Sequence, residues 1–285
     1  VEKVVTPHTT VYCPGQLKVG NRIFRCWKRS GHGTVSLVTA LKDSCDVYFY
    51  QVGLWLGADR LIEWSSRLGV GQVTGIDLPG ESRGNLAGRE WKKRRFSESW
   101  FHGDTVNYSI GQGFLLMTPL QLARVYAALA NGGTLVVPHL SAGEHPQGTD
   151  LHLPKEALGW VRKGMEEVVK SGTGRASGVY GVTVTGKTGT AQNPHGDDHA
   201  WFVGYAPSDN PRYVAVALVE ALLPVVGERE HDVVAVLREV AEAGGAARAQ
   251  LLAAAAARGA AVPGARLRPL VVGPHDEVDD AADGV

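Results

Sequence analysis

The chain has 285 residues, of which 44% are hydrophobic and 20% are charged, and its 29 Lys and Arg balance its 29 Asp and Glu. This composition is typical of a globular protein with an apolar core, in one large domain or two ordinary ones, and it excludes wholesale disorder. Three cysteines are too few for a disulfide-packed mini-protein, and zero net charge argues against nucleic acid as the main partner. No stretch approaches the roughly 18 consecutive apolar residues of a membrane span, and the first residues do not have a signal-peptide layout.

Residues 1–34 are predicted to form strands and a hairpin. Thr9–Tyr12 and Arg22–Trp27 are rich in β-branched and aromatic residues, and turn-prone Gly and Pro positions separate them. Cys13 and Cys26 are then expected on opposite arms of this hairpin. They could pair as a disulfide in an oxidising compartment, or they could remain two separate thiols.

Residues 36–57 are predicted to be helical, with a polar break in the middle. Ser36 is a suitable N-cap for the first part, and the second part, residues 47–56, is apolar almost all round, as in a buried helix. The polar break is Asp43–Asp46. A further helix is expected over residues 58–68.

The middle of the chain is expected to be loop-rich over residues 71–115 and helical after that. Thr118 can cap a helix, Pro119 fits its first turn, and Gly132 can end it in the left-handed conformation. Another helix is expected over residues 154–170.

Short β-rich runs follow at residues 179–185, 200–205 and 213–219. Turn signals separate these runs, and consecutive strands joined by short loops predict an antiparallel meander. Helices followed by such a meander indicate an α+β fold, in which helices flank an antiparallel sheet.

The composition changes again after Glu220. Residues 221–285 are rich in Ala and contain few bulky apolar side chains, so they are interpreted as an atypical tail that follows a domain portion at residues 1–220. Two explanations remain open for this tail. One is a divergent helix around Asp232–Ala243, and the other is an altered reading frame at the end of the gene.

The tetrapeptide Lys187–Thr190 follows one β-rich run and precedes another. A Lys beside hydroxyl groups at a sheet edge can bind a carboxylate, and exposed backbone N–H groups there can polarise a carbonyl. Such a short motif is by itself a weak signal, because an ordinary solvent-facing strand end can look the same.

Three further motifs accompany it in a fixed order. Ser44-x-Asp46 lies upstream between two apolar helical segments, Ser109–Gly113 precedes the helix at Thr118, and Gly172–Arg175 precedes Lys187. This ordered set resembles the transpeptidase domain of penicillin-binding proteins, whose motifs are S-x-x-K, S-D-N and K-T-G. The resemblance covers residues 4–220 and is strongest to the elongation-type class B proteins, the penicillin-binding protein 2 group. It is carried by Thr9–Gly15, Arg25–Lys28, Gly31–Gly33, Ser44–Tyr50 and Thr185–Gln192.

The resemblance implies a serine β-lactamase-like transpeptidase fold and a D,D-transpeptidase that cross-links peptidoglycan without a cofactor. In this family an active-site Ser attacks the D-Ala-D-Ala amide of a stem peptide, and an amine from a neighbouring strand takes up the acyl group. β-Lactams mimic the dipeptide and trap the acyl-enzyme. The implied parent acts at the periplasmic face of the bacterial inner membrane, with a glycosyltransferase of the elongation machinery as partner.

The resemblance also assigns catalytic residues. Ser44 would join the proton relay to the leaving or attacking amine, and Lys187 would supply positive charge. Asp46 stands where the pattern usually has Asn, and an ionised Asp can only accept hydrogen bonds. The role of Asp46 toward the substrate amide is therefore in doubt.

The substrate-binding residues implied by the resemblance are those of the Lys-Thr-Gly-Thr motif. Lys187, Thr188 and Thr190 would bind the terminal carboxylate of the stem peptide, and Gly189 lies between the two threonines. The backbone N–H of Thr190 would be one oxyanion donor, with the nucleophilic Ser as the other.

The nucleophile motif has no match in this sequence. No Ser is followed by Lys three positions later, and the family places this motif N-terminal to S-x-N. The chain is therefore interpreted as the C-terminal portion of a transpeptidase domain, an incomplete fold that is expected to be inactive alone. Two alternatives stay open: a serine β-lactamase or β-lactam sensor-like domain, and a non-catalytic module that binds peptidoglycan or a partner.

No metal site is expected. His195 and His199 have i,i+4 spacing, but they fall in a Gly- and Asp-containing turn rather than on a helix. Cys45, inside the Ser44-x-Asp46 motif, is expected to pack in the core because no His or Asn partner for a nucleophile is evident.

Overall fold

The computed structural model describes residues 2–141, 143, 146–194, 196–220 and 266–272. Its largest sheet has the strand order β10-β9-β8-β7, and each neighbouring pair is antiparallel. This confirms the predicted α+β fold with an antiparallel sheet flanked by helices. The four strands are β7 (Thr185–Ala191), β8 (His199–Ala206), β9 (Tyr213–Glu220) and β10 (Arg266–Val272).

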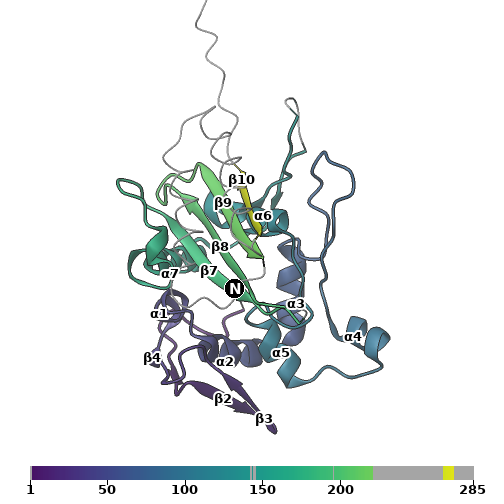
Figure 1. Cartoon of the computed structure of the whole chain (residues 1–285), viewed down its shortest axis with the longest axis vertical. Helices are drawn as coiled ribbons and strands as arrows, with labels where there is room; N and C mark the ends of the chain where they lie inside the picture. The colour runs from purple at the N-terminus through teal and green to yellow at the C-terminus, as the bar shows by residue number, and fades with distance from the viewer. Residues whose placement is uncertain (1, 142, 144–145, 195, 221–265, 273–285) are drawn as a thin grey trace, which may run out of the picture.

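Two long helices pack against this sheet (Figure 1). They are α6 (Pro119–Asn131) and α7 (Lys155–Ser171), both at the predicted positions. The Thr118 hydroxyl accepts the backbone N–H of Gln121 at 3.1 Å and thereby caps α6. Their shared core is apolar and includes Ala123, Met165, Tyr205, Val214 and Val216.

The N-terminal part forms a separate layer below the sheet in Figure 1, and its short strands pair in a nested order. The predicted pairing of residues 9–12 with residues 22–27 is wrong: β3 (Arg22–Arg25) forms a hairpin with β2 (Gln16–Val19), and β1 (Val11–Cys13) pairs with β4 (Gly33–Val35) around that hairpin. Cys13 thus pairs with Gly33 across β1 and β4 rather than lying on a hairpin arm. Cys13 and Cys26 are both free thiols, so the structure shows the second alternative, two separate thiols, and not a disulfide.

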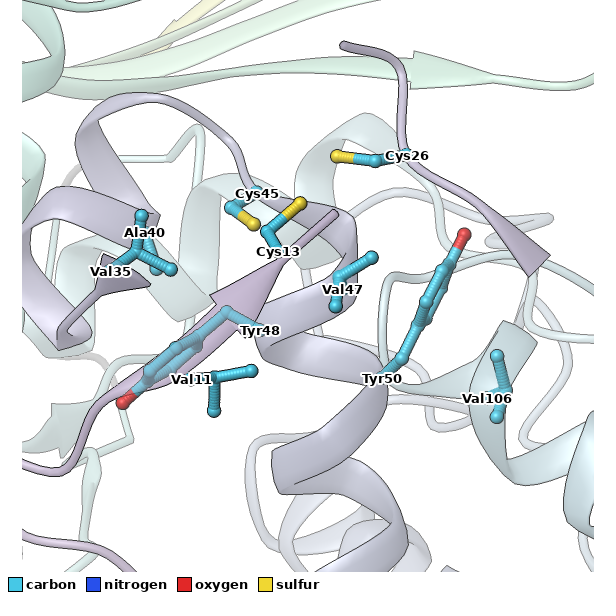
Figure 2. Close-up of a cluster of buried hydrophobic side chains, with 10 residues drawn as sticks. All are labelled: Val11, Cys13, Cys26, Val35, Ala40, Cys45, Val47, Tyr48, Tyr50 and Val106. Atoms are coloured by element: carbon cyan, nitrogen blue, oxygen red, sulfur yellow. The ribbon is translucent and has the colours of Figure 1, made fainter. Parts of the chain in front are cut away.

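The polar break in the predicted helix at residues 36–57 is real. It separates α1 (Leu37–Lys42) from α2 (Asp46–Leu56), and α3 (Ala58–Arg67) follows directly. One side of α2 enters a core cluster with Val11, Val106 and the three cysteines, whose sulfur atoms face one another in Figure 2. Gly53 allows α2 to approach the end of α5 (His102–Tyr108) closely, because a Cβ there would collide with the Ser109 side chain.

The region 71–115, expected to be loop-rich, contains two short helices. They are α4 (Arg89–Phe96) and α5 (His102–Tyr108). The sequence of α4 is rich in Arg and Lys and has no apolar stripe, so its periodicity gave no helix signal. A tertiary contact holds it instead: the buried Lys92 forms a 2.6 Å ion pair with Asp104 of α5.

The strand expected at residues 179–185 lies later in the chain. Val179 and Val182 form only an isolated bridge, and β7 begins at Thr185. The Lys187–Thr190 motif is consequently inside an edge strand rather than after one. The remaining short elements are β5 (Thr134–Leu135), β6 (Thr149–Asp150) and the 3-10 helix η1 (Arg175–Ser177).

Within the tail, the structure describes β10, which pairs with β9 from Arg266↔Glu220 to Val272↔Val214. The helix proposed around Asp232–Ala243 lies outside the described residues. Among the helices that the structure describes, none has the length and apolar character needed to cross a membrane.

Candidate active site

The predicted site residues converge on one cavity of about 1070 Å³ between the sheet and the N-terminal layer. Ser44 and Asp46 come from the junction of α1 and α2, and Lys187 comes from β7. Thr188, Gly189 and Thr190 continue along the same strand. The structure therefore brings together all six residues that the sequence analysis named.

Ser44 and Lys187 make the central contact of this cavity. The Lys187 Nζ donates a 2.8 Å hydrogen bond to the Ser44 Oγ across the gap between the two layers. The same ammonium donates to the Thr188 carbonyl at 3.0 Å. Because an ammonium has three N–H donors, these two bonds leave capacity for a ligand carboxylate in the cavity.

The backbone at Ser44 is in the left-handed region, with φ of 53°. Such a conformation costs a non-glycine residue stability, and it tends to persist where the surrounding structure enforces it. Here the backbone N–H of Ser44 donates to the Leu41 carbonyl, and the backbone N–H of Cys45 donates to the Ala40 carbonyl. These two hydrogen bonds terminate α1. The resulting tight turn presents the Ser44 hydroxyl to Lys187.

Asp46 is held by Trp27, a residue that the sequence analysis did not place in the site. The backbone N–H of Trp27 donates to the Asp46 Oδ2 at 2.8 Å. Its indole Nε1 is 3.0 Å from both the Asp43 and the Ser44 carbonyl oxygen atoms. Trp27 also lines the cavity, so it both fixes the turn and forms part of the wall.

Burial shifts the pKa values of both charged residues in the cavity. It lowers the pKa of Lys187 to about 8, and the nearby negative charge of Asp46 opposes this shift. It raises the pKa of Asp46 to about 6, against the stabilising hydrogen bond from the Trp27 backbone. A lysine with such a pKa can hold or release a proton near neutral pH, as proton transfer requires.

The wall beyond Lys187 is supplied by the Gly172–Arg175 motif. The Thr173 hydroxyl is 2.8 Å from the Thr188 hydroxyl, which ties this motif to β7. Thr173 therefore orients the Thr188 side chain. The sequence analysis had named Thr173 only as a member of the Gly172–Arg175 motif. Gln112, from the Ser109–Gly113 motif, reaches β7 from the opposite side of the cavity.

A group of thiols and an imidazole lies directly behind the Ser44–Asp46 turn, and the sequence analysis named no such set. One potential ligand atom from each of Cys13, Cys26, His32 and Cys45 lies within 4.8 Å of all the others. All three cysteines are fully buried. Their wide spacing in the sequence hid the set, because Cys13 ends β1, Cys26 follows β3, His32 precedes β4 and Cys45 precedes α2.

The distances within this group agree with those of a tetrahedral zinc site. The His32 Nδ1 is 3.7 Å from the Cys13 Sγ and 3.5 Å from the Cys26 Sγ. Zinc bonds of about 2.3 Å to sulfur and about 2.0 Å to nitrogen place such ligand atoms about 3.6 Å apart. A hydrogen bond from the Cys45 thiol lowers the pKa of the Cys26 thiol, which favours the thiolate form that metals bind.

His195 lies outside the described residues, so the expectation that His195 and His199 do not form a metal site stays a prediction.

Comparison with known proteins gives a consistent match over most of the chain. The family model described as the penicillin-binding protein transpeptidase domain matches residues 1–242. A curated relative, the peptidoglycan D,D-transpeptidase MrdA of Haemophilus influenzae, is 39% identical over 251 residues. That alignment covers 77% of this chain and 38% of the relative, so the chain spans about two fifths of the length of this relative.

Solved structures agree with this match. Penicillin-binding protein 2 from Helicobacter pylori, in its complex with MreC, has a TM-score of 0.72 and 37% identity. The match covers 76% of this chain and 42% of that one. Penicillin-binding protein 2 from Pseudomonas aeruginosa, in complex with WCK 5153, has a TM-score of 0.70 and 40% identity, covering 76% of this chain and 50% of that one.

Proposed function

The chain belongs to the penicillin-binding protein transpeptidase family, and we propose that it supplies the peptide-binding half of an active site that cross-links peptidoglycan. The observation that carries this proposal is the 2.8 Å bond between Lys187 and Ser44, made across the cavity by two motifs far apart in sequence. A non-catalytic surface does not require a half-buried lysine whose pKa is lowered toward neutrality.

In the proposed reaction, a serine nucleophile opens the D-Ala-D-Ala amide and keeps the acyl group while D-Ala leaves. An acceptor amine then displaces the serine and restores its hydroxyl. Lys187 attracts the terminal carboxylate of the stem peptide, and the Thr188 and Thr190 hydroxyls bind its oxygen atoms. Ser44 accepts from Lys187, so its own O–H is free to donate, which suits a relay that delivers a proton to the leaving amine.

The nucleophile of this reaction is proposed to come from an S-x-x-K segment N-terminal to residue 1. No serine in the sequence has Lys three positions later, although the other motifs are present in order. The parent protein is proposed to act at the periplasmic face of the inner membrane on peptidoglycan stem peptides. Its proposed inhibitors are β-lactams, and its proposed partner is a glycosyltransferase of the elongation machinery.

A fluorescent penicillin tests this assignment. We expect no covalent labelling of the 285-residue chain, and labelling of a longer product of the same reading frame that contains the upstream S-x-x-K. In that longer protein Lys187→Ala should reduce the labelling rate at least tenfold, whereas Lys163→Ala, on the exposed side of α7, should not.

Two results would argue against the proposal. Labelling of the 285-residue chain would show that the nucleophile lies within it. Rapid hydrolysis of the penicillin by the longer protein would favour a β-lactamase.

A second role is proposed for Cys13, Cys26, His32 and Cys45: together they hold a structural zinc ion. The distances given above and the burial of the three sulfur atoms support this. When bound, the ion would neutralise the thiolates and join the strand pair β1–β4 to the start of α2. Cys45 lies between Ser44 and Asp46, and Cys26 precedes Trp27, so these four ligands would also fix the turn that presents Ser44.

A further inference from the structure

Positive charge is concentrated in the hairpin β2–β3 and in the turn that follows it. Residues 16–30 contain five Lys and Arg and no Asp or Glu, although the chain as a whole is neutral. All five side chains are exposed, and in the part of the chain that the structure describes none of them forms an ion pair. Exposed cations that are not paired within the protein create a positive potential that attracts an anionic partner. The five are Lys18, Arg22, Arg25, Lys28 and Arg29.

The hairpin has one face toward the core and one toward solvent. Leu17 and Phe24 pack against the core cluster beside α2. Because side chains alternate along a strand, Lys18 of β2 and Arg25 of β3 lie on the opposite face. Ile23, which pairs with Lys18 across the hairpin, is 55% exposed. The hairpin projects from the lower end of the molecule in Figure 1, so its outer face is open to a partner.

This positive surface adjoins the cavity of the candidate active site. Trp27 lines the cavity and is 57% exposed, so it forms part of the rim. Arg25, Lys28 and Arg29 lie within two residues of Trp27, and two residues of chain span at most about 7 Å. A ligand that leaves the cavity past Trp27 therefore comes within reach of their long side chains. We call Lys18, Arg25, Lys28 and Arg29 the basic face.

The ligand proposed for the cavity has the complementary charge. Each stem peptide ends in a carboxylate, and one glycan strand carries many stem peptides, so an uncross-linked strand is a polyanion. Lys and Arg bind carboxylates through charge-assisted hydrogen bonds. Once one stem peptide of a strand is bound, its neighbours are held close to the protein at a high effective concentration, and several weak contacts then add up.

We propose that the basic face is a second binding site for peptidoglycan, outside the cavity. It binds the carboxylates of stem peptides that neighbour the one in the cavity on the same strand. This inference rests on the proposed function, because that function places the first stem peptide in the cavity. The basic face takes no part in the chemistry, and it makes the protein select polymeric strands over single peptides.

The test titrates two probes into the 285-residue chain. One is diacetyl-L-Lys-D-Ala-D-Ala, a single stem-peptide end, and the other is soluble uncross-linked peptidoglycan at the same concentration of stem peptide. The triple variant Lys18→Gln, Arg25→Gln, Lys28→Gln should bind the strands about tenfold more weakly, since each exposed ion pair contributes a factor of about two. Its binding of the tripeptide should not change. Salt at about 0.5 M should abolish the difference between variant and native chain, because it screens exposed charges.

The matched control is the triple variant Lys93→Gln, Arg94→Gln, Arg95→Gln. It removes the same amount of charge from exposed positions of α4. Amide NMR spectra of the β8 and β9 residues, unchanged from the native chain, show that each variant is folded. Phosphatidylglycerol vesicles are a third probe, because a membrane surface is also anionic.

The outcomes separate this inference from the proposed function. Weaker strand binding by the hairpin variant, but not by the α4 variant, supports the inference. Equal strand binding by the native chain and the hairpin variant, or an equal loss in both variants, overturns this inference alone if the native chain still binds the tripeptide. Binding of the native chain to the vesicles but not to the strands also overturns it and assigns the basic face to a membrane. Binding of neither peptidoglycan probe by the native chain overturns the proposed function as well.

Discussion

The core beside α2 and the core beneath β8 and β9 are built differently. The second consists of apolar side chains from four long elements, α6, α7, β8 and β9, among them Met165 of α7 and Val216 of β9. The first has strands of three or four residues, and three thiols occupy its centre. Short strands bury little apolar area, so a region of this kind usually needs a cross-link or a metal.

This difference is important because the Ser44–Asp46 turn of the candidate active site belongs to the first region. Ser44 and Asp46 flank a cysteine of the buried group, whereas Lys187 belongs to the sheet. The sheet can position Lys187 by hydrogen bonding and apolar packing alone. We therefore expect the geometry of Ser44 to depend on what holds Cys13, Cys26, His32 and Cys45 together.

The largest expected effect comes from metal binding. Zinc at a thousand times its dissociation constant should stabilise the folded chain by about 4 kcal/mol, because it binds the folded site only. Thermal unfolding of metal-depleted and zinc-loaded protein measures this, with metal content determined in parallel. Cys45→Ala should remove the response to zinc, and an equal response in native protein and variant would exclude this site.

A smaller effect is expected from the sheet core. Val216 is completely buried, and Val216→Ala should lower the free energy of unfolding by about 2 kcal/mol through lost burial and the cavity left behind. Denaturant unfolding gives this value. The loss should be the same with and without zinc, and a zinc-dependent loss would show that the two cores are not independent.

The pH dependence of stability should report on Lys187. Its pKa is lowered to about 8 in the folded protein, so between about pH 8 and its ordinary value the unfolded chain binds more protons. Stability should therefore rise with pH in this window. The gain should be on the order of 1–2 kcal/mol, since Lys187 lines a cavity that water enters. Lys187→Met should lack this rise, which unfolding at a series of pH values would reveal.

The smallest effect is expected for Trp27→Phe, which removes the indole donor and keeps an aromatic ring. Because Trp27 is 57% exposed, the loss of stability should stay below about 1 kcal/mol. The amide signals of Ser44 and Asp46 should nevertheless shift in NMR spectra. Trp55→Phe, at the far end of α2, serves as control, and equal shifts at Ser44 in both variants would contradict a positioning role for Trp27.

The sequence was sufficient for those elements whose signals are local. Thr118, Pro119 and Gly132 bound α6 as predicted, and the polar residues at 43–46 interrupt the helix as predicted. The helix α4 was missed because the buried pair of Lys92 and Asp104, rather than an apolar stripe, holds it. The start of β7 was misplaced because pairing with β8 decides it, and that partner lies downstream.

By itself the sequence determined the family and the absence of an S-x-x-K motif in the 285 residues, and it predicted Ser44, Asp46 and Lys187 as site residues. Local spacing and residue type contain this information. Only the tertiary structure decided that Lys187 bonds Ser44, that Gln112 occupies the edge of β7, and that three cysteines and His32 meet behind the turn. These contacts join residues distant in sequence, so they depend on how the sheet and the N-terminal layer pack together.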